Sequence, residues 1–262
     1  MKKSIYSKIG LMAALAAVLI IAGCHKVKDK AANGSIGIHL HTQIDTNEVD
    51  VLGQLYPDHN GRLLALNDAR FYITDVSLQN ADGSWYSIPN SMILKTYEAE
   101  DYYIASVPSG NYTSIRFYVG LDSATNASLP SSHNNSSGQD TILSSILEPN
   151  MYFGAGQGYK FLYLSGAVLP TGSHSPVSVN YQVGGNSNRQ LITMPYLAYS
   201  VQPGLLHYVH IWCDYGKLLE GIAISTGNND IGNSFGTGQQ VTTATLVADS
   251  IQNMFTYEPG QQ

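Results

Sequence analysis

Short stretches in which apolar and polar residues alternate recur along this chain, and residues that favour turns separate them. In the stretch 36–44, Ile and Leu alternate with Gly, His and Gln. The stretches 69–78 and 112–120 repeat this two-residue period, which is typical of a β-strand with one buried face. Turn signals lie at 80–83 (NADG) and 108–111 (PSGN). We therefore expect an all-β fold, an antiparallel β-sandwich.

The phase of this alternation shifts once within the stretch 69–78. Phe71 and Ile73 lie at odd positions, whereas Val76 and Leu78 lie at even positions. One extra residue in a strand moves every later side chain to the other face. The shift therefore predicts either a β-bulge or a strand that is covered on both faces.

Two further segments complete the predicted domain. Residues 121–150 are rich in Ser, Asn and Gly, which predicts a long surface loop. Residues 243–254 place apolar side chains among helix formers, which predicts a short C-terminal helix. Because we find no internal repeat and no second type of composition, we expect one β-sandwich domain with long loops over residues 35–262.

The first residues are typical of an export signal. Lys2, Lys3 and Lys8 precede an apolar run at 11–22 that is too short to span a bilayer comfortably. The run ends in Gly23-Cys24, which resembles the bacterial lipobox, whose Cys is acylated before cleavage. We expect a signal peptide at 1–23, a lipidated Cys24, and a tether that ends at residue 34. The alternative is an N-terminal membrane anchor that is never cleaved.

Acyl chains on Cys24 would hold the protein on a membrane. We therefore expect a lipid-anchored protein of the bacterial cell envelope, with the membrane as a partner through its acyl chains. His25 follows the cysteine, and it is not the Asp that commonly signals retention in the inner membrane. This favours the outer membrane, and a periplasmic position and a surface-facing one both stay open.

The charge of the chain is divided unevenly. The formal net charge is −6, and six of the 13 basic residues but only one of the 19 acidic residues precede Ala31. The remainder carries 7 basic and 18 acidic residues, a net charge of −11. Such a surface repels nucleic acid and anionic lipid headgroups. We therefore expect no nucleic-acid partner.

Signals of catalysis are few. The sequence contains no GxSxG, HExxH or P-loop motif, and no GxGxxG in a βαβ setting. Glu98, Glu100 and Asp101 are clustered, and they fit either a pair of glycosidase carboxylates or a solvated loop before a strand. We expect a protein that is not an enzyme.

The histidines carry the strongest signal of metal chemistry. His39 and His41 are two residues apart, so they share one face of a strand. Imidazoles at this spacing can chelate a transition metal, although a solvent-facing polar row has the same pattern. His207 and His210 are three apart and point to opposite faces, so only one of them can join a given site. Cys213 fits either a buried small side chain or a soft metal ligand.

A series of short motifs follows a fixed order through the predicted domain. In chain order they are ARFYITDVSL (69–78), ADG (81–83), VPSGNY (107–112), FYVGLDS (117–123) with Asn126, LEPNMY (147–152), GYKF (158–161), YQVGG (181–185), HIWCDYGKLL (210–219) and IQNMF (251–255). Over residues 35–257 this order resembles the MbnP-like family, the methanobactin-associated copper-binding periplasmic proteins and their lipoprotein relatives. The resemblance implies a non-catalytic protein, copper as the cofactor, and an envelope haem peroxidase-like protein as a partner.

The chain departs from this family where the copper-binding relatives carry their ligands. The stretch 153–156 reads FGAG and lacks the family's Trp residues. Gln182 stands where the family has a His, and Asn126 is followed by Ala127 instead of His. Because Gln and Asn are poor ligands for Cu(I), a copper site would have to be rebuilt elsewhere. The candidate ligands are His39, His41, His207 and His210.

Three functions remain open. The first is copper binding or handling through this divergent histidine site. The second is a metal-free module that recognises a ligand or a glycan, because 18 Tyr, two Trp and long polar loops have the composition of polar binding surfaces. The third is an accessory partner of an envelope haem peroxidase-like protein, which an acidic surface could bind electrostatically.

Overall fold

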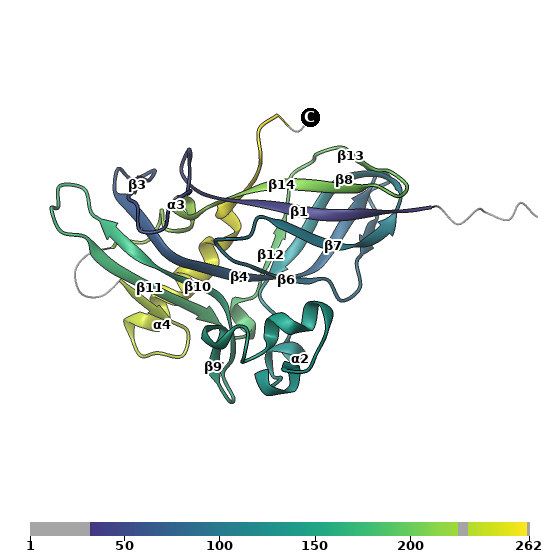
Figure 1. The fold of residues 1–262 in the computed structure, drawn as a ribbon. Coiled ribbons are helices and arrows are strands. Elements are labelled where there is room, and N and C mark those ends of the chain that lie inside the picture. Colours follow the sequence, from purple (N-terminus) through teal and green to yellow (C-terminus); the bar gives the residue numbers. More distant parts are fainter. Residues whose placement is uncertain (1–31, 225–229, 261–262) are drawn as a thin grey trace, which may run out of the picture. The chain divides into compact units, whose positions relative to one another are not determined.

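The computed structural model describes residues 32–224 and 230–260 (Figure 1). The predicted signal peptide, the lipidation site Cys24 and most of the tether lie outside the described residues. The domain forms one compact unit that starts at Ala32. Its first strand, β1, includes Asn33 and Gly34, which the sequence assigned to the tether. Among the described residues, no helix is long and apolar enough to cross a membrane.

The described strands form two sheets, and the first is built around β1 (Asn33–Ile44). On one side β1 pairs with β14 (Leu206–Asp214), which in turn pairs with β16 (Phe255–Tyr257). On the other side β1 pairs with β7 (Asp101–Pro108) and β2 (Asn47–Glu48). The β1–β14 pair is parallel, so the sheet is mixed and the expected antiparallel pattern does not hold throughout.

The second sheet has β4 and β10 at its centre (Figure 1). Its path runs through β12 (Gln190–Thr193), β8 (Gly110–Val119), β4 (Leu63–Asn80), β10 (Gly158–Leu169), β11 (Val177–Gly184) and β15 (Ile231–Asn233). Shorter strands pair with this path: β3 (Tyr56–Pro57), β5 (Trp85–Ser87), β6 (Met92–Lys95), β9 (Tyr152–Gly154) and β13 (Tyr199–Val201). Its pairs are antiparallel except for β11–β15.

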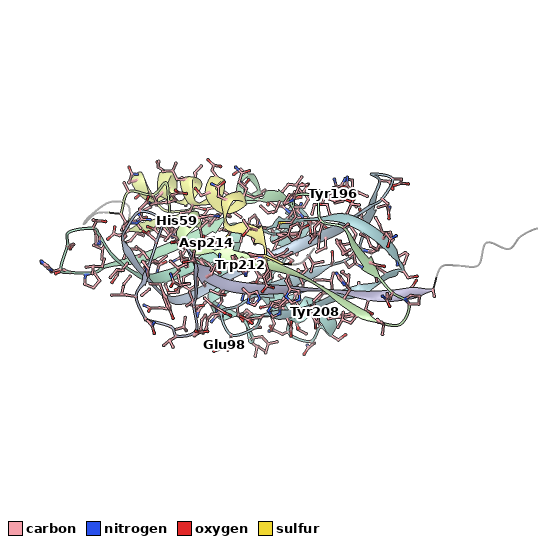
Figure 2. All side chains as sticks on the ribbon, turned by 90° about the horizontal axis from the view of Figure 1, so that it is seen from above. His59, Glu98, Tyr196, Tyr208, Trp212 and Asp214 are labelled. Atoms are coloured by element: carbon pink, nitrogen blue, oxygen red, sulfur yellow. The ribbon has the colours of Figure 1, made fainter. Side chains whose placement is uncertain are left out.

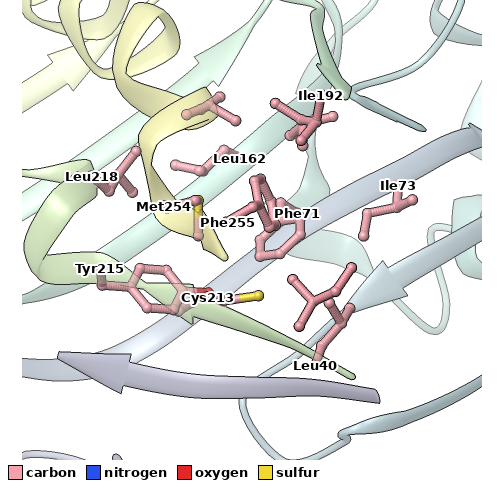
Figure 3. Packing of buried hydrophobic residues seen from close by; sticks show 14 of the residues in the cluster. Leu40, Phe71, Ile73, Leu162, Ile192, Cys213, Tyr215, Leu218, Met254 and Phe255 are labelled. Atoms are coloured by element: carbon pink, nitrogen blue, oxygen red, sulfur yellow. The ribbon is translucent and has the colours of Figure 1, made fainter. Parts of the chain in front are cut away.

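The core lies between the inner faces of these two sheets. Leu40 and Cys213 of the first sheet belong to the same buried cluster as Phe71 and Leu162 of the second (Figure 3). Phe255 joins them, because its ring meets the Phe71 ring edge to face at 5.7 Å between centroids. Burying each large apolar side chain contributes about 1.5–3 kcal/mol. These contacts confirm the β-sandwich and explain the alternating apolar residues of β1.

The predicted bulge is present in β4. The pairing of β4 with β8 shifts register between Thr74 and Ser77, and Asp75 adopts a φ of 52°. The left-handed region is rare for residues other than glycine and is tolerated best by Asn and Asp. The extra residue returns Val76 and Leu78 to the core and turns the Asp75 side chain outward, where it is 55% exposed.

The long polar segment is a loop with local helical turns. It contains α2 (Ser123–Asn126) and three 3₁₀ helices, η1 (Pro130–His133), η2 (Gly138–Leu143) and η3 (Pro149–Met151). The Asp122 side chain caps α2 by accepting from two backbone N–H groups. A small separate core holds the loop on the sheet; its members include Tyr72, Tyr159, Leu143 and Met151. The loop is therefore packed against the domain.

Four further helical elements complete the described part of the domain. A short helix, α3 (Tyr215–Leu218), follows β14 directly, and a 3₁₀ turn, η4 (Asn186–Asn188), precedes β12. The predicted C-terminal helix is confirmed as α4 (Gln239–Ser250), continued by the 3₁₀ helix η5 (Ile251–Met254). Its buried residues are Thr243, Ala244, Val247, Ala248, Ile251 and Met254, so one face of this segment packs on the sandwich.

Candidate metal centre

The parallel pairing of β1 with β14 brings three imidazoles together on the outer face of the first sheet. In this pairing His39 lies opposite His210, and His41 lies opposite Trp212. The apolar residues between these positions, Leu40 and Ile211, point into the core. Because side chains alternate along each strand, the inward apolar residues force the three histidines outward.

The three rings are close enough to share one ion. The His39 ring centroid lies 4.2 Å from that of His41 and 4.7 Å from that of His210. One nitrogen of each ring lies within 4.8 Å of the others. A tetrahedral ion bound at ~2.0 Å by each nitrogen would separate the nitrogens by ~3.3 Å. Ion binding therefore requires only that the three rings close together, and their chemistry fits copper or zinc.

Carboxylates orient these rings from the outside. Asp101 Oδ1 lies 2.6 Å from His39 Nδ1, which leaves the Nε2 of His39 for an ion. Glu258 Oε2 lies 3.1 Å from His210 Nδ1 and 3.6 Å from His41 Nε2. A carboxylate on the second ring nitrogen fixes the tautomer of a ligating histidine and raises its basicity. Asp101 holds such a position beside His39.

Burial favours the neutral form of one of the three imidazoles, His210. The pKa of His210 is lowered, first by burial and next by the neighbouring His39. A metal ligand must be the neutral imidazole, so the lowered pKa favours the form that can bind. Glu258 opposes this effect, but burial is the larger cause.

A second group of donors overlaps the first. His41, Glu48 and Glu100 also place one ligand atom each within 4.8 Å of one another. Glu48 Oε1 lies 3.4 Å and Glu100 Oε1 lies 3.9 Å from His41 Nδ1. An open hollow of about 520 Å³ lies beside this group, and its lining residues include His39, Glu48, Tyr97, Glu98, Glu100 and Asp101. His41 therefore belongs to both groups.

Large aromatic side chains lie on both sides of the imidazoles along β14. Tyr208 and Trp212 are two residues before and after His210 (Figure 2). The Tyr208 ring lies across Gly37 of β1, where a Cβ atom would come within 2.5 Å of the ring. Only glycine fits this approach. His210 and its strand partner His39 therefore lie between a tyrosine and a tryptophan, and His41 lies beside the tryptophan.

A buried lysine holds the loop that carries two of the carboxylates. Lys95 is fully buried, and its Nζ donates to the carbonyl oxygen of Ala99 at 2.7 Å. The Tyr102 hydroxyl donates to the same oxygen and accepts from the Thr96 backbone N–H. Burial lowers the pKa of Lys95. These bonds fix the turn before Glu100, whose carboxylate lies beside His39 and His41.

The fourth predicted ligand, His207, does not join this group, and the reason is its spacing. It lies three positions before His210, an odd spacing, so it points to the other face of β14. There its ring stacks on Tyr199, with centroids 5.1 Å apart and an interplanar angle of 2°. Cys213 is also excluded, because it is fully buried and burial raises its pKa to about 12. It is a core residue.

Two further histidines of the described residues, His59 and His133, lie apart from the cluster. His59 forms ion pairs with Asp214 at 2.8 Å and with Asp45 at 3.1 Å, and Figure 2 labels His59 and Asp214. His133 Nε2 lies 2.8 Å from the Ser128 hydroxyl. Both imidazoles are satisfied by partners of the domain itself, which indicates structural roles.

Two amides at or beside the positions where the resemblance places histidine ligands are used within the fold: Gln182 replaces one such His, and Asn126 precedes the other position, which is Ala127. Asn126 accepts from the Tyr159 backbone N–H at 2.8 Å and donates to the Asn186 side chain at 3.0 Å. Gln182 donates to Asn180 at 3.0 Å. Asn126 thus makes hydrogen bonds that shape the loop, and Gln182, which departs from the family pattern, makes one within its strand.

Sequence reasoning found the three imidazoles but missed most of their acidic neighbours. Glu100 and Asp101 were noticed as a cluster, but nothing in the sequence placed them beside His39. Glu48 and Glu258 carried no signal of their own. The missing information was the register of strand pairing, which puts Asp101 opposite His39 and brings the C-terminal segment alongside β14.

Comparison with known proteins agrees with this architecture. The family profile of MbnP matches residues 33–235, whereas no curated protein matches the chain. A solved structure, MbnP from Methylosinus trichosporium, is similar, with a TM-score of 0.50 and 17% sequence identity over 74% of this chain and 80% of that chain. At this identity the likeness shows a shared fold. Because the family profile spans most of the described domain, the chain belongs to the MbnP family.

Proposed function

We propose that this protein is a non-catalytic, lipid-anchored envelope protein that binds copper through His39, His41 and His210. The convergence of these three imidazoles on one face of the sheet is the observation that carries the proposal. Three imidazoles leave a fourth position of a four-coordinate ion open, through which copper could be received or passed on. Membership of the MbnP family supports copper as the metal.

The donor set favours Cu²⁺ over Cu⁺. The three ligands are imidazoles, and the groups around them are carboxylates from Glu48, Glu100, Asp101 and Glu258. Thiolates and thioethers, which select Cu⁺, are absent from the two described donor groups. Among divalent first-row ions, Cu²⁺ binds most tightly to a given nitrogen and oxygen site. Negative charge around the site also favours a dication over a monocation.

The location and the partner rest on the sequence. The lipobox-like Ile21–Cys24 segment supports an acylated Cys24 and a place on the bacterial envelope, the outer membrane in preference to the inner. The resemblance supports a haem peroxidase-like envelope protein as a partner. The acidic side chains around the imidazoles would attract a partner with a basic surface.

Copper retention by the full chain tests the metal site. The full chain, purified in detergent, is loaded with Cu²⁺, desalted and assayed for bound metal. We expect about one copper ion per wild-type chain and its loss in the His39→Ala/His41→Ala variant. His207→Ala is the matched control, because it removes an imidazole from β14 outside the group, and it should retain copper.

Two results would contradict the proposal. The first is a wild-type chain that retains no copper after desalting. The second is retention by the double variant at the wild-type level, since copper would then be bound elsewhere. Circular dichroism of each variant shows that any loss comes from the removed ligands, because the substituted side chains lie on the outer face and not in the core.

A further inference from the structure

The outer face of the second sheet carries a row of stacked arginine and aromatic side chains. The guanidinium carbon of Arg116 lies 4.2 Å from the centroid of the Trp85 ring. The guanidinium carbon of Arg189 lies 3.8 Å from the centroid of the Tyr118 ring. A guanidinium held over an aromatic ring is attracted by the ring's negative face, and the stacking fixes the orientation of the guanidinium plane.

The strand pairing explains why these four residues form one row. Arg116 and Tyr118 are two residues apart on β8, so they share a face. Leu191 of β12 lies opposite Tyr118, and Ser77 of β4 lies opposite Arg116. Arg189 precedes β12 directly and reaches back over Tyr118. Arg116, Tyr118 and Arg189 line a groove of about 430 Å³, and Trp85 lies against Arg116 outside this lining. The other lining residues are Asp75, Ser77, Ser87, Ile88, Pro89, Asn90 and Leu191.

The two arginines differ in how their charge is balanced. One terminal nitrogen of Arg189, Nη2, donates to the carboxylate of the bulge residue Asp75 and to the Thr74 hydroxyl. Within the described residues, the guanidinium of Arg116 makes no hydrogen bond and has no carboxylate oxygen within 4.0 Å. Arg116 is thus a positive charge, fixed in orientation by Trp85, whose N–H groups have no acceptor in the described part of the chain.

The positions of Arg116 and Asp75 determine which ligand charge the groove favours. A guanidinium binds a carboxylate through two parallel N–H···O bonds. A phosphate dianion is less suited, because it would bring a second negative charge close to Asp75 and into a domain with a net charge of −11. The groove therefore favours a monoanionic carboxylate.

The other residues of the groove indicate which class of molecule carries the carboxylate. Ser77, Ser87 and Asn90 offer hydroxyl and amide groups, whereas Leu191 is 46% exposed and offers an apolar surface. A sugar ring has hydroxyl groups on its edge and C–H groups on its face. We propose that this groove binds a carboxylate-bearing sugar of the uronic acid class, with its carboxylate on Arg116 and one face of its ring on Leu191.

Fluorescence of Trp85 measures this binding directly. The chain has two Trp, so the Trp212→Phe variant leaves Trp85 as the only one. The full chain in detergent, with chelator present, is titrated with D-glucuronate, and a saturable change in emission is expected. D-glucose, which lacks the carboxylate, should give no change at the same concentrations. Calorimetric titration of the wild-type chain repeats the measurement without the substitution.

Substitutions separate the role of Arg116 from the effect of charge alone. Arg116→Gln should weaken glucuronate binding at least tenfold. The affinity of Arg116→Lys should lie between those of the wild type and Arg116→Gln, because lysine keeps the positive charge but lacks the two parallel N–H donors of the guanidinium. Lys217→Gln removes one positive charge outside the groove and should bind as the wild type does. The His39→Ala/His41→Ala variant should also bind normally, because the groove does not depend on the metal site.

Several outcomes would overturn the inference. One is the absence of a saturable signal by both methods. Another is equal affinity in Arg116→Gln, which would leave Arg116 without a role. Acetate binding as tightly as glucuronate would contradict the sugar, and tighter binding of inorganic phosphate would contradict the carboxylate. Thermal melting of each variant excludes loss of folding as the cause of lost binding.

Discussion

The outer faces of the two sheets differ in the chemistry they present. The first sheet gathers imidazoles and carboxylates around His39, His41 and His210. The second gathers guanidinium groups and aromatic rings around Arg116 and Arg189. The two sheets pack on the same core, and each outer face is formed by the strand residues whose side chains point away from that core. The apolar alternation thus determines which residues face outward on either sheet, while the identity of those outward residues can vary to specify a ligand.

The largest expected difference between the two faces follows from removing one imidazole. His41 belongs to both groups of donors on the first sheet. His41→Ala should therefore weaken Cu²⁺ binding by more than the ~100-fold that loss of an orienting partner causes at most. Competition with a chelator of known affinity measures this change.

Glucuronate binding by His41→Ala supplies the control, since Trp85 and Arg116 lie on the other sheet. If the substitution weakened the binding of Cu²⁺ and of glucuronate equally, the two faces would not bind their ligands independently.

Removing an orienting carboxylate should have a smaller effect. Asp101 Oδ1 lies 2.6 Å from His39 Nδ1, and Asp101→Asn keeps the shape of the side chain while removing its charge. We expect Cu²⁺ affinity to fall about 10–100-fold, as it does when the partner of a ligating histidine is lost. Glu98→Gln is the matched control, because Glu98 lines the same hollow but has no short contact with the imidazoles among the described interactions. Equal effects of the two substitutions would show that only the summed charge matters.

Salt should affect the ligand affinities of the two faces to different extents. Carboxylate binding at Arg116 depends on the attraction of partly exposed charges, which salt screens over about 8 Å at physiological ionic strength. Glucuronate affinity should therefore fall several-fold between low salt and 0.5 M salt, whereas copper held by coordinate bonds should change less. Titration of each ligand at both salt concentrations checks this. A larger fall in affinity for copper than for glucuronate would contradict the assignment of coordinate bonds to the first sheet and screened charge attraction to the second.

The smallest effect concerns a histidine that lies between two carboxylates. The pKa of His59 is raised, chiefly by its hydrogen bond with Asp214, so the protonated form stabilises the folded state. This stabilisation is complete below the unfolded pKa of about 6.5 and is lost as the pH rises through the higher folded pKa. His59→Gln should therefore melt below the wild type at pH 6, and the gap should narrow at pH 9. A gap that widens with pH would contradict the assignment.

The sequence predicted those features that depend on neighbouring residues. The alternation in 36–44 was enough to predict a strand, and the phase shift at Val76 predicted either a bulge or a strand covered on both faces, because both follow from side-chain direction along one strand. His39 and His41 shared a face for the same reason, and His207 was separated from His210 by parity alone.

The features that depend on distant pairing were not predictable. No local signal tells that β1 pairs with β14 in parallel, or that the register sets His39 opposite His210. The position of Trp85 under Arg116 depends on two strand pairings in the second sheet. Such contacts follow from how the two sheets fill their shared core, which is a property of the whole chain.

The parallel pairing of β1 with β14 also orders the formation of the site in time. The first two imidazoles are specified by residue 41, but the third arrives only with residue 210, after both sheets have most of their strands. Contacts between residues so far apart in sequence form late, because closing a long loop must precede them. A chain that stops before β14 would carry only His39 and His41 of the three imidazoles of the site. Full copper affinity is thus a property that only a completed and folded chain can acquire.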